Sequence, residues 1–258
     1  VVVAPERHPQ LVEVGVQQRH VGPHAERDVG RVLPRDAGAD HHDVGAHQFL
    51  EAGTAQFGLH HLEDLLVALL HGLRQQRHRG GGGYASLADF VAPEGLPDWV
   101  GGFVVTAGDE TARAQSFRDA HDDFSAILLQ ALSDRFAEAM AEMLHERVRR
   151  SYWGYAPDEA LSNEELIREN YQGIRPAPGY PACPEHTEKE KIWDLLDVDD
   201  IGIELTESMA MWPGAAVSGW YFSHPQSQYF VVGRLSKEQV ADYARRKGVD
   251  LAQAERSE

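Results

Sequence analysis

The sequence has one cysteine and no long apolar run. Because Cys183 is the only cysteine in this chain of 258 residues, an internal disulfide bond is excluded. No stretch approaches the ~18 consecutive apolar residues of a membrane-spanning helix. The first residues also lack the basic and apolar pattern of a secretory signal. These absences favour a protein of the reducing cytoplasm.

Positive charge is also scarce. The chain has 24 Lys and Arg against 41 Asp and Glu, a formal net charge of -17. Such a chain repels nucleic acid phosphates and anionic lipids, so we expect neither nucleic acid nor a membrane as a partner. The hydrophobic content of 42% is ordinary for a globular protein.

The first 72 residues lack eight amino-acid types: Ser, Ile, Asn, Lys, Met, Trp, Tyr and Cys. They also hold 9 of the 14 histidines. This composition favours a foreign, out-of-frame or low-complexity segment over residues 1–69, followed by a folded domain over residues 70–258. Within residues 59–70, the leucine spacing predicts a helix with one apolar face.

The pattern downstream predicts an α+β or mixed α/β fold with a mainly antiparallel twisted sheet flanked by helices. Residues 100–106 are typical of a strand, and residues 113–150 of one long helix. Residues 219–223 and 228–232 are typical of a β-hairpin. The long helix carries an apolar residue every four positions: Phe124, Leu128, Leu132, Phe136, Met140, Leu144 and Val148. Capping residues predict three further helix starts: Ser162, Thr187 and Ser236.

The most informative segment is Arg175–Pro184, which has four prolines in nine positions. Proline excludes a helix and a central strand here, so the backbone must run extended. An extended backbone keeps carbonyl and N–H groups available for a ligand. Gly179 allows close approach, and Arg175 offers a rigid fork for a carboxylate.

Several strings, in one register from about residue 70 to the C-terminus, carry a resemblance to a known family. They are Leu87–Pro93, Leu144–Arg149, Ser151–Pro157, Leu161–Lys189, Leu205–Ser208, Ala210–Ala215 and Ser218–Pro225. They resemble the C-terminal activation domain of cobalamin-dependent methionine synthase. That domain binds S-adenosylmethionine and supports reductive methylation of inactive cob(II)alamin. The resemblance implies a neighbouring cobalamin-binding domain and a flavodoxin-type electron donor as partners.

The resemblance also implies roles for residues of the proline-rich segment. Arg175 would pair with the carboxylate of S-adenosylmethionine. Backbone groups of Ala177 and Gly179 would hold the adenosine and methionine ends of the ligand. Tyr180 would lie near the methyl group that is transferred, which makes it the catalytic candidate.

Four residues outside the segment complete the implied site. Tyr229 and Phe230 would close the adenosine side of the ligand. Glu138 would accept a hydrogen bond from the ligand ammonium, and Asp134, one helical turn earlier, would face the cobalamin domain. Ordinary structural roles stay open for these positions, because Glu138 could be a solvated carboxylate and Tyr229 a cross-strand packing residue.

Ordinary structural roles also stay open for two other residues. Arg175 could cap a helix end, and Cys183 is more typical of a small buried side chain than of a nucleophile. No Asp-Trp-Thr-Pro-Phe string of the family occurs, although it contributes an aspartate to the ligand site. The alternative is therefore a ligand-incompetent remnant that acts only as a docking scaffold.

Residues 40–45 fit the cobalamin-binding pattern D-x-H-x-x-G, with His42 as the nominal cobalt ligand. The Lys-Asn that follows in the family is absent, and a histidine-rich stretch meets a short pattern by chance. We therefore expect no metal site here. Without zinc-ligand cysteines or a folate barrel, the chain cannot turn over methionine by itself. An independent methyltransferase is disfavoured because no glycine-rich strand-turn-helix loop occurs.

Limited trypsin digestion tests the division of the chain near residue 69. Ordering a residue costs ~1–2 kcal/mol of backbone entropy. A segment poor in large apolar residues buries too little apolar surface to offset this cost. We expect early cleavage within residues 1–58, at Arg7, Arg19, Arg27, Arg31 and Arg35. A resistant fragment should begin between residues 35 and 84. If those arginines survive as long as Arg135 and Arg147, the segment is folded and the division is wrong.

Overall fold

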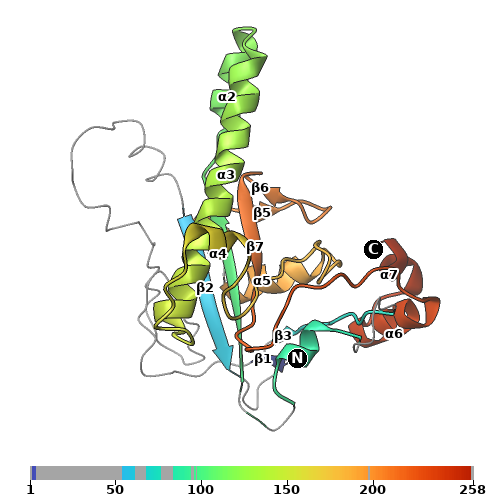
Figure 1. The fold of residues 1–258 in the computed structure, drawn as a ribbon. Helices are drawn as coiled ribbons and strands as arrows, with labels where there is room; N and C mark the ends of the chain where they lie inside the picture. Colours follow the sequence, from blue (N-terminus) through green and yellow to red (C-terminus); the bar gives the residue numbers. More distant parts are fainter. Residues whose placement is uncertain are drawn as a thin grey trace, which may run out of the picture.

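The computed structural model describes residues 2–3, 54–61, 68–76, 84–93, 96, 98–196 and 198–256. Its centre is a three-stranded antiparallel sheet in the order β2 (Thr54–His61), β4 (Trp99–Thr106) and β7 (Ala216–Tyr221) (Figure 1). In the middle strand, Phe103 lies opposite position 57 of β2 and Gly219 of β7. The expected antiparallel sheet with flanking helices is confirmed.

Helices cover both faces of this sheet. Because successive side chains of a strand point to opposite faces, Phe103 and Val105 pack against α3 (Asp123–Arg147). Val100 and Val104 pack on the other face, with apolar residues of α5 (Glu188–Leu196). All four of these β4 side chains are buried. This explains why β4 has no charged residue and only one polar residue, Thr106: the sheet is the middle of three layers.

Smaller elements connect and flank these layers. They are β1 (Val2–Val3), β3 (Ala68–Leu69), η1 (Leu87–Phe90), α4 (Asn163–Ile167), η3 (Val198–Ile201), β5 (Glu204–Leu205), β6 (Met211–Trp212), α6 (Lys237–Lys247) and α7 (Leu251–Arg256). Ser162 and Ser236 cap α4 and α6 as expected. Thr187 is expected to cap the start of α5, but its hydroxyl donates to the Glu185 carboxylate instead. In the described part of the chain, no helix is long and apolar enough to cross a bilayer.

The expectation of a single helix over residues 113–150 is wrong. The structure has α2 (Thr111–Asp119), a turn, α3, and then a π-helical turn, η2 (Val148–Tyr152). His121 adopts a φ of 58°, which ends the first helix, and the Asp122 carboxylate accepts from the backbone N–H of Ser125 at 3.0 Å. The sequence pattern missed this turn because helical spacing resumes immediately after it.

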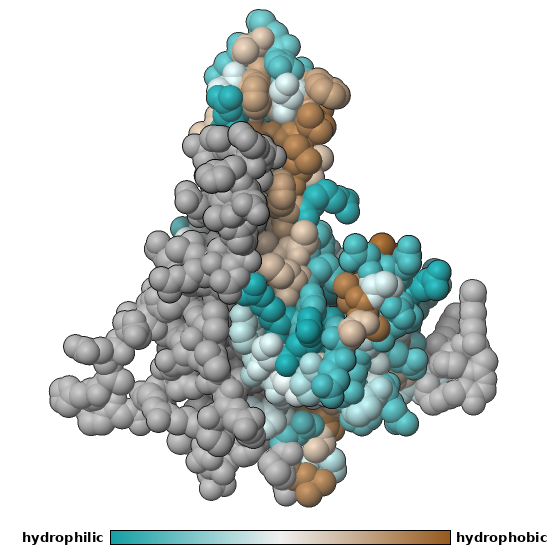
Figure 2. Space-filling view, turned by 60° about the vertical axis from the view of Figure 1, so that its left-hand side comes forward, coloured by the Kyte–Doolittle hydropathy of each residue, from teal (hydrophilic) through white to brown (hydrophobic). Residues whose placement is uncertain are grey.

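The α2–α3 pair projects beyond the end of the sheet (Figure 1). Of the predicted apolar stripe on α3, only the inner end, Leu144, and Val148 just beyond it lie in the core. The outer residues are exposed: Phe124, Leu128, Leu132 and Phe136. Figure 2 shows this column of apolar side chains on the projecting helices. The four-residue spacing therefore predicted the helical face correctly but not how far the sheet covers it.

Two other expected elements are also wrong. Residues 59–61 belong to β2 and residues 68–69 to β3, so no continuous helix spans 59–70; residues 62–67 lie outside the described residues. The predicted 219–223/228–232 hairpin does not form, because β7 pairs with β4 on one edge and with residues 174–176 on the other. Residues 228–232 run as an irregular segment, in which the Val232 N–H donates to the Pro181 carbonyl at 2.8 Å.

A buried polar cluster joins α6 to the start of α5. Lys247 donates to Glu185 and to Glu188, at 3.3 Å for the latter, and the Tyr243 hydroxyl donates to Glu185 at 2.8 Å. Both carboxylates are almost fully buried. Burial alone would raise the pKa of Glu185, but hydrogen bonds from Lys247 and Thr187 outweigh burial and lower it. The cluster therefore requires an ionised Glu185.

We expect Lys247→Met to destabilise the protein by about 3 kcal/mol at pH 7, because it leaves buried carboxylates without their cation. Since the pKa of Glu185 is lowered in the folded state, its contribution is present above the unfolded value of about 4.3 and is lost at lower pH. The difference between variant and wild type should shrink on acidification. Urea unfolding at several pH values measures this. Lys237→Met, an exposed change on the same helix, is the control, and equal stability of both variants would contradict the prediction.

Candidate functional site

The proline-rich segment forms an additional edge of the central sheet. Ile174 exchanges two backbone hydrogen bonds with Phe222, at 2.9 and 3.0 Å. The Trp220 N–H donates to the Pro176 carbonyl at 2.9 Å. Gly219 permits this approach, because a Cβ there would lie 2.9 Å from the Pro176 oxygen. The expected extended backbone thus runs along β7, and no strand among the described residues pairs with its second edge.

Backbone groups on the open edge face away from β7. The Arg175 N–H donates to the Tyr229 hydroxyl at 3.0 Å. Because hydrogen-bonding direction alternates along an extended chain, the Ala177 N–H shares this side, and it has no hydrogen-bond partner among the described residues. The open edge therefore offers a backbone donor beside Arg175.

Beyond Ala177 the chain folds into a tight turn. The Tyr180 N–H donates to the Ala177 carbonyl at 3.1 Å, and the Gly179 N–H donates to the Cys183 carbonyl at 2.7 Å. Gly179 has a φ of +92°, and a Cβ there would lie 2.3 Å from the His186 ring. Because the N–H of Gly179 donates to the Cys183 carbonyl, it is already bonded inside the turn. Tyr180, at the turn, has a 61% exposed side chain.

The Arg175 side chain reaches from the sheet edge to α3. Its Nη2 donates to the Glu142 carboxylate. The side chain is 15% exposed, and its Nη1 is buried without a hydrogen-bond partner among the described residues. Burial alone would lower the pKa of Arg175, but Tyr229 and Glu142 outweigh it and raise that pKa. Arg175 is thus permanently charged, and its Nη1 is an N–H donor without a partner among the described residues.

An aromatic and cationic layer lies under Arg175. Arg149 pairs with Glu159 through two hydrogen bonds of 2.6 and 2.7 Å, and its guanidinium lies 4.3 Å from the centre of the Tyr171 ring. The His145 ring stacks on Tyr221 at 5.0 Å. Burial, reinforced by Arg149 and Arg175, lowers the pKa of His145 well below its ordinary value, so it is neutral near pH 7. The arginine of this layer is already paired with Glu159.

The remaining predicted residues divide into two groups. Glu138 lies exposed on α3, one turn before Glu142, and Tyr229 contacts Arg175 through its hydroxyl. Tyr229 therefore lies with the arginine, and Glu138 lies on the helix whose Glu142 contacts it. Phe230 instead packs on the core, with its ring 6.3 Å from that of Phe90. The structure thus brings the tyrosine to the arginine and packs the partly buried phenylalanine against the core, and the role of Glu138 stays a prediction.

Sequence reasoning missed Glu142. Its position four residues after Glu138 places both carboxylates on one helical face, and this spacing was the available signal. It also missed the support from Arg149 and Tyr171. No local pattern links these residues, because they meet only through the packing of η2 against the segment before Arg175.

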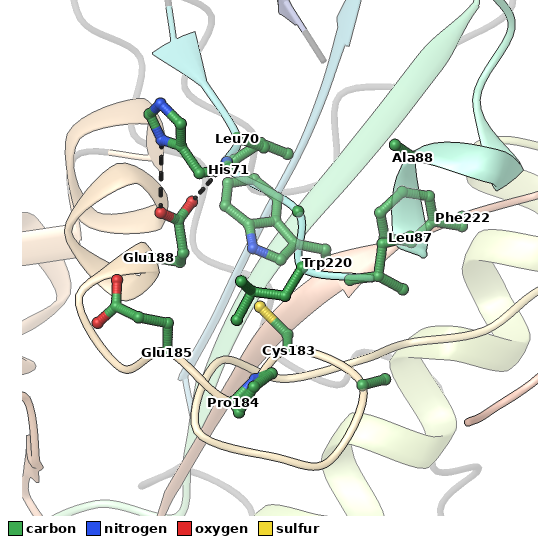
Figure 3. Close-up of a pocket in the computed structure, with 13 residues that line it drawn as sticks. Leu70, His71, Leu87, Ala88, Cys183, Pro184, Glu185, Glu188, Trp220 and Phe222 are labelled. Atoms are coloured by element: carbon green, nitrogen blue, oxygen red, sulfur yellow. Dashed lines mark hydrogen bonds and ion pairs between the residues drawn. The ribbon is translucent and has the colours of Figure 1, made fainter. Parts of the chain in front are cut away.

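A hollow lies on the inner side of the proline-rich loop (Figure 3). Apolar residues such as Leu87, Trp220 and Phe222 line most of it, and Glu188 interacts with His71 across one end. Cys183 contributes its thiol, whose pKa burial raises to about 12. None of the predicted ligand-binding side chains line this hollow. It belongs to the packing beneath the loop, and Cys183 is too weakly ionised to act as a nucleophile.

The fold and site together define an α+β domain whose sheet edge presents a buried arginine and an open backbone donor. The family model for the activation domain of vitamin B12 dependent methionine synthase matches residues 54–248. The chain belongs to this family. It is also similar to a solved structure, the MetH reactivation domain bound to AdoHcy, with 51% sequence identity and a TM-score of 0.76. That match covers 82% of this chain and 73% of the other.

The family match begins at residue 54, where β2 also begins. The amino-acid composition instead predicts that the folded domain begins after residue 69. Residues 54–61 supply the third strand of the central sheet. The division after residue 69 stays a prediction. The cobalamin-like pattern with His42 lies outside the described residues, as does the Gly80–Gly83 run.

Gly179→Ala should destabilise the protein by about 1–3 kcal/mol, the usual cost of a non-glycine residue in a sparsely populated conformation. The positive φ and the close His186 ring are the two causes. Thermal unfolding measures the loss. Gly214→Ala is the matched control, because a Cβ there meets nothing within 4 Å. Adding His186→Ala should restore only part of the loss, since the backbone strain remains. A Gly179→Ala protein as stable as the control would contradict this reading of the turn.

Proposed function

We propose that this chain binds S-adenosylmethionine along the Arg175–Tyr180 segment and acts as the reactivation module of a cobalamin-dependent methionine synthase. The Nη1 of Arg175, which is buried and has no hydrogen-bond partner among the described residues, carries this proposal. An enclosed donor without an acceptor costs about 1–3 kcal/mol. An incoming carboxylate would remove that cost and gain a charge-assisted hydrogen bond.

The groups around Arg175 fit the rest of such a ligand. Glu138 offers an exposed carboxylate for the ligand ammonium. The Ala177 N–H, which has no partner among the described residues, offers a donor on the sheet edge. Tyr180 and Tyr229 present aromatic rings next to this edge, suited to a sulfonium cation. The Gly179 carbonyl accepts no hydrogen bond from the described residues and can serve the ligand as an acceptor, although its N–H is already bonded.

The similarity to a reactivation domain bound to AdoHcy supports the ligand class, because AdoHcy shares the adenosyl and amino-acid groups of S-adenosylmethionine. When bound, S-adenosylmethionine would supply a methyl group to cobalamin held on a neighbouring domain. A flavodoxin-type partner would supply the electron. The chain's own groups would bind and orient the methyl donor. The single cysteine fits a protein of the cytoplasm.

Arg175→Ala tests the proposal in the full chain. Removing one partner of a desolvated charge pair costs ~2–5 kcal/mol, so saturable binding of S-adenosylmethionine by the wild type should be lost in the variant. Isothermal titration calorimetry measures both. The matched control is Arg150→Ala, which removes an exposed arginine paired with Glu146 on the same helical segment.

The outcomes separate this function from its rival. Binding by wild type and Arg150→Ala but not by Arg175→Ala supports the proposal. Equal binding by all three proteins would remove Arg175 from the site. An absence of binding in the wild type would favour the docking scaffold, which needs no ligand.

A further inference from the structure

Glu142 contacts the guanidinium of Arg175 from α3. It binds only one of the two terminal nitrogens, Nη2, and the other terminal nitrogen, Nη1, remains unpartnered among the described residues. The guanidinium is planar and rigid, so fixing one nitrogen also fixes the direction of the other. The ion pair therefore sets where the spare donor of Arg175 points.

We propose that Glu142 is a positioning residue, which holds Arg175 so that Nη1 is preset for the carboxylate of an amino-acid-type ligand. This inference rests on the proposed function. Without Glu142, the long arginine side chain would have to be ordered when the ligand binds. Ordering such a side chain costs about 0.5–1.5 kcal/mol, which corresponds to a roughly two- to tenfold weaker affinity.

A competing effect is repulsion between Glu142 and the ligand carboxylate. The Glu142 side chain is 50% exposed, so solvent screens its charge. The ligand also carries an ammonium next to its carboxylate, and the attraction of this cation offsets the repulsion. Orientation of Arg175 therefore outweighs repulsion, and removal of the Glu142 charge should weaken binding.

Glu142→Gln in the full chain tests this, with two probes measured by calorimetry. S-adenosylhomocysteine has the amino-acid group, whereas 5′-methylthioadenosine lacks it. We expect the Kd for S-adenosylhomocysteine to rise about two- to tenfold and the Kd for 5′-methylthioadenosine to stay unchanged. Glu142→Asp, which keeps the charge on a shorter side chain, should lie between wild type and Glu142→Gln.

Glu146→Gln is the matched control, because Glu146 lies one turn further along α3 and pairs with Arg150 away from the site. It should bind both probes like the wild type, and thermal unfolding should show that every variant is folded at the temperature of the titration. Unchanged or tighter binding of S-adenosylhomocysteine by Glu142→Gln would overturn the inference, as would equal weakening of both probes. A wild type that binds no S-adenosylhomocysteine would instead overturn the proposed function on which the inference rests.

Discussion

The pairing of residues 174–176 with the free edge of β7 is the constraint on which the rest of the site depends. Three backbone hydrogen bonds hold the segment there. They fix which backbone groups face the sheet and which face outward, because these directions alternate along an extended chain. The proline at position 176 is tolerated since only its carbonyl is used.

Two buried ionic groups hold the ends of this edge. Before Arg175, the Arg149–Glu159 pair and the stacked Tyr171 ring fix the chain that enters the segment. After the turn, Glu185 and Lys247 tie the chain to α6. Breaking such groups is costly because each leaves an uncompensated buried charge. The position of the proline-rich segment is thus determined by elements distant in sequence.

The helix α3 has two distinct parts. Its inner half packs small and apolar side chains, such as Ala141 and Leu144, onto the sheet. Its outer half leaves an apolar column exposed on the projecting helix pair. Glu142 lies near the junction of these parts, where it contacts Arg175, and Glu138 lies one turn earlier on the same helix. The same helix therefore supplies part of the core and the acidic side of the site.

The sequence by itself determined the family, the extended proline-rich segment and the candidate residues Arg175, Glu138 and Tyr229. These follow from local chemistry, since proline restricts its own backbone and long matching strings carry a resemblance without any structure. Only the tertiary structure decided that β7 pairs with residues 174–176 rather than with a hairpin partner, and that Phe230 turns into the core. It also decided that Glu142 meets Arg175. Such choices depend on which segments compete for one strand edge or one helix face, and that competition is settled by packing between residues far apart in the chain.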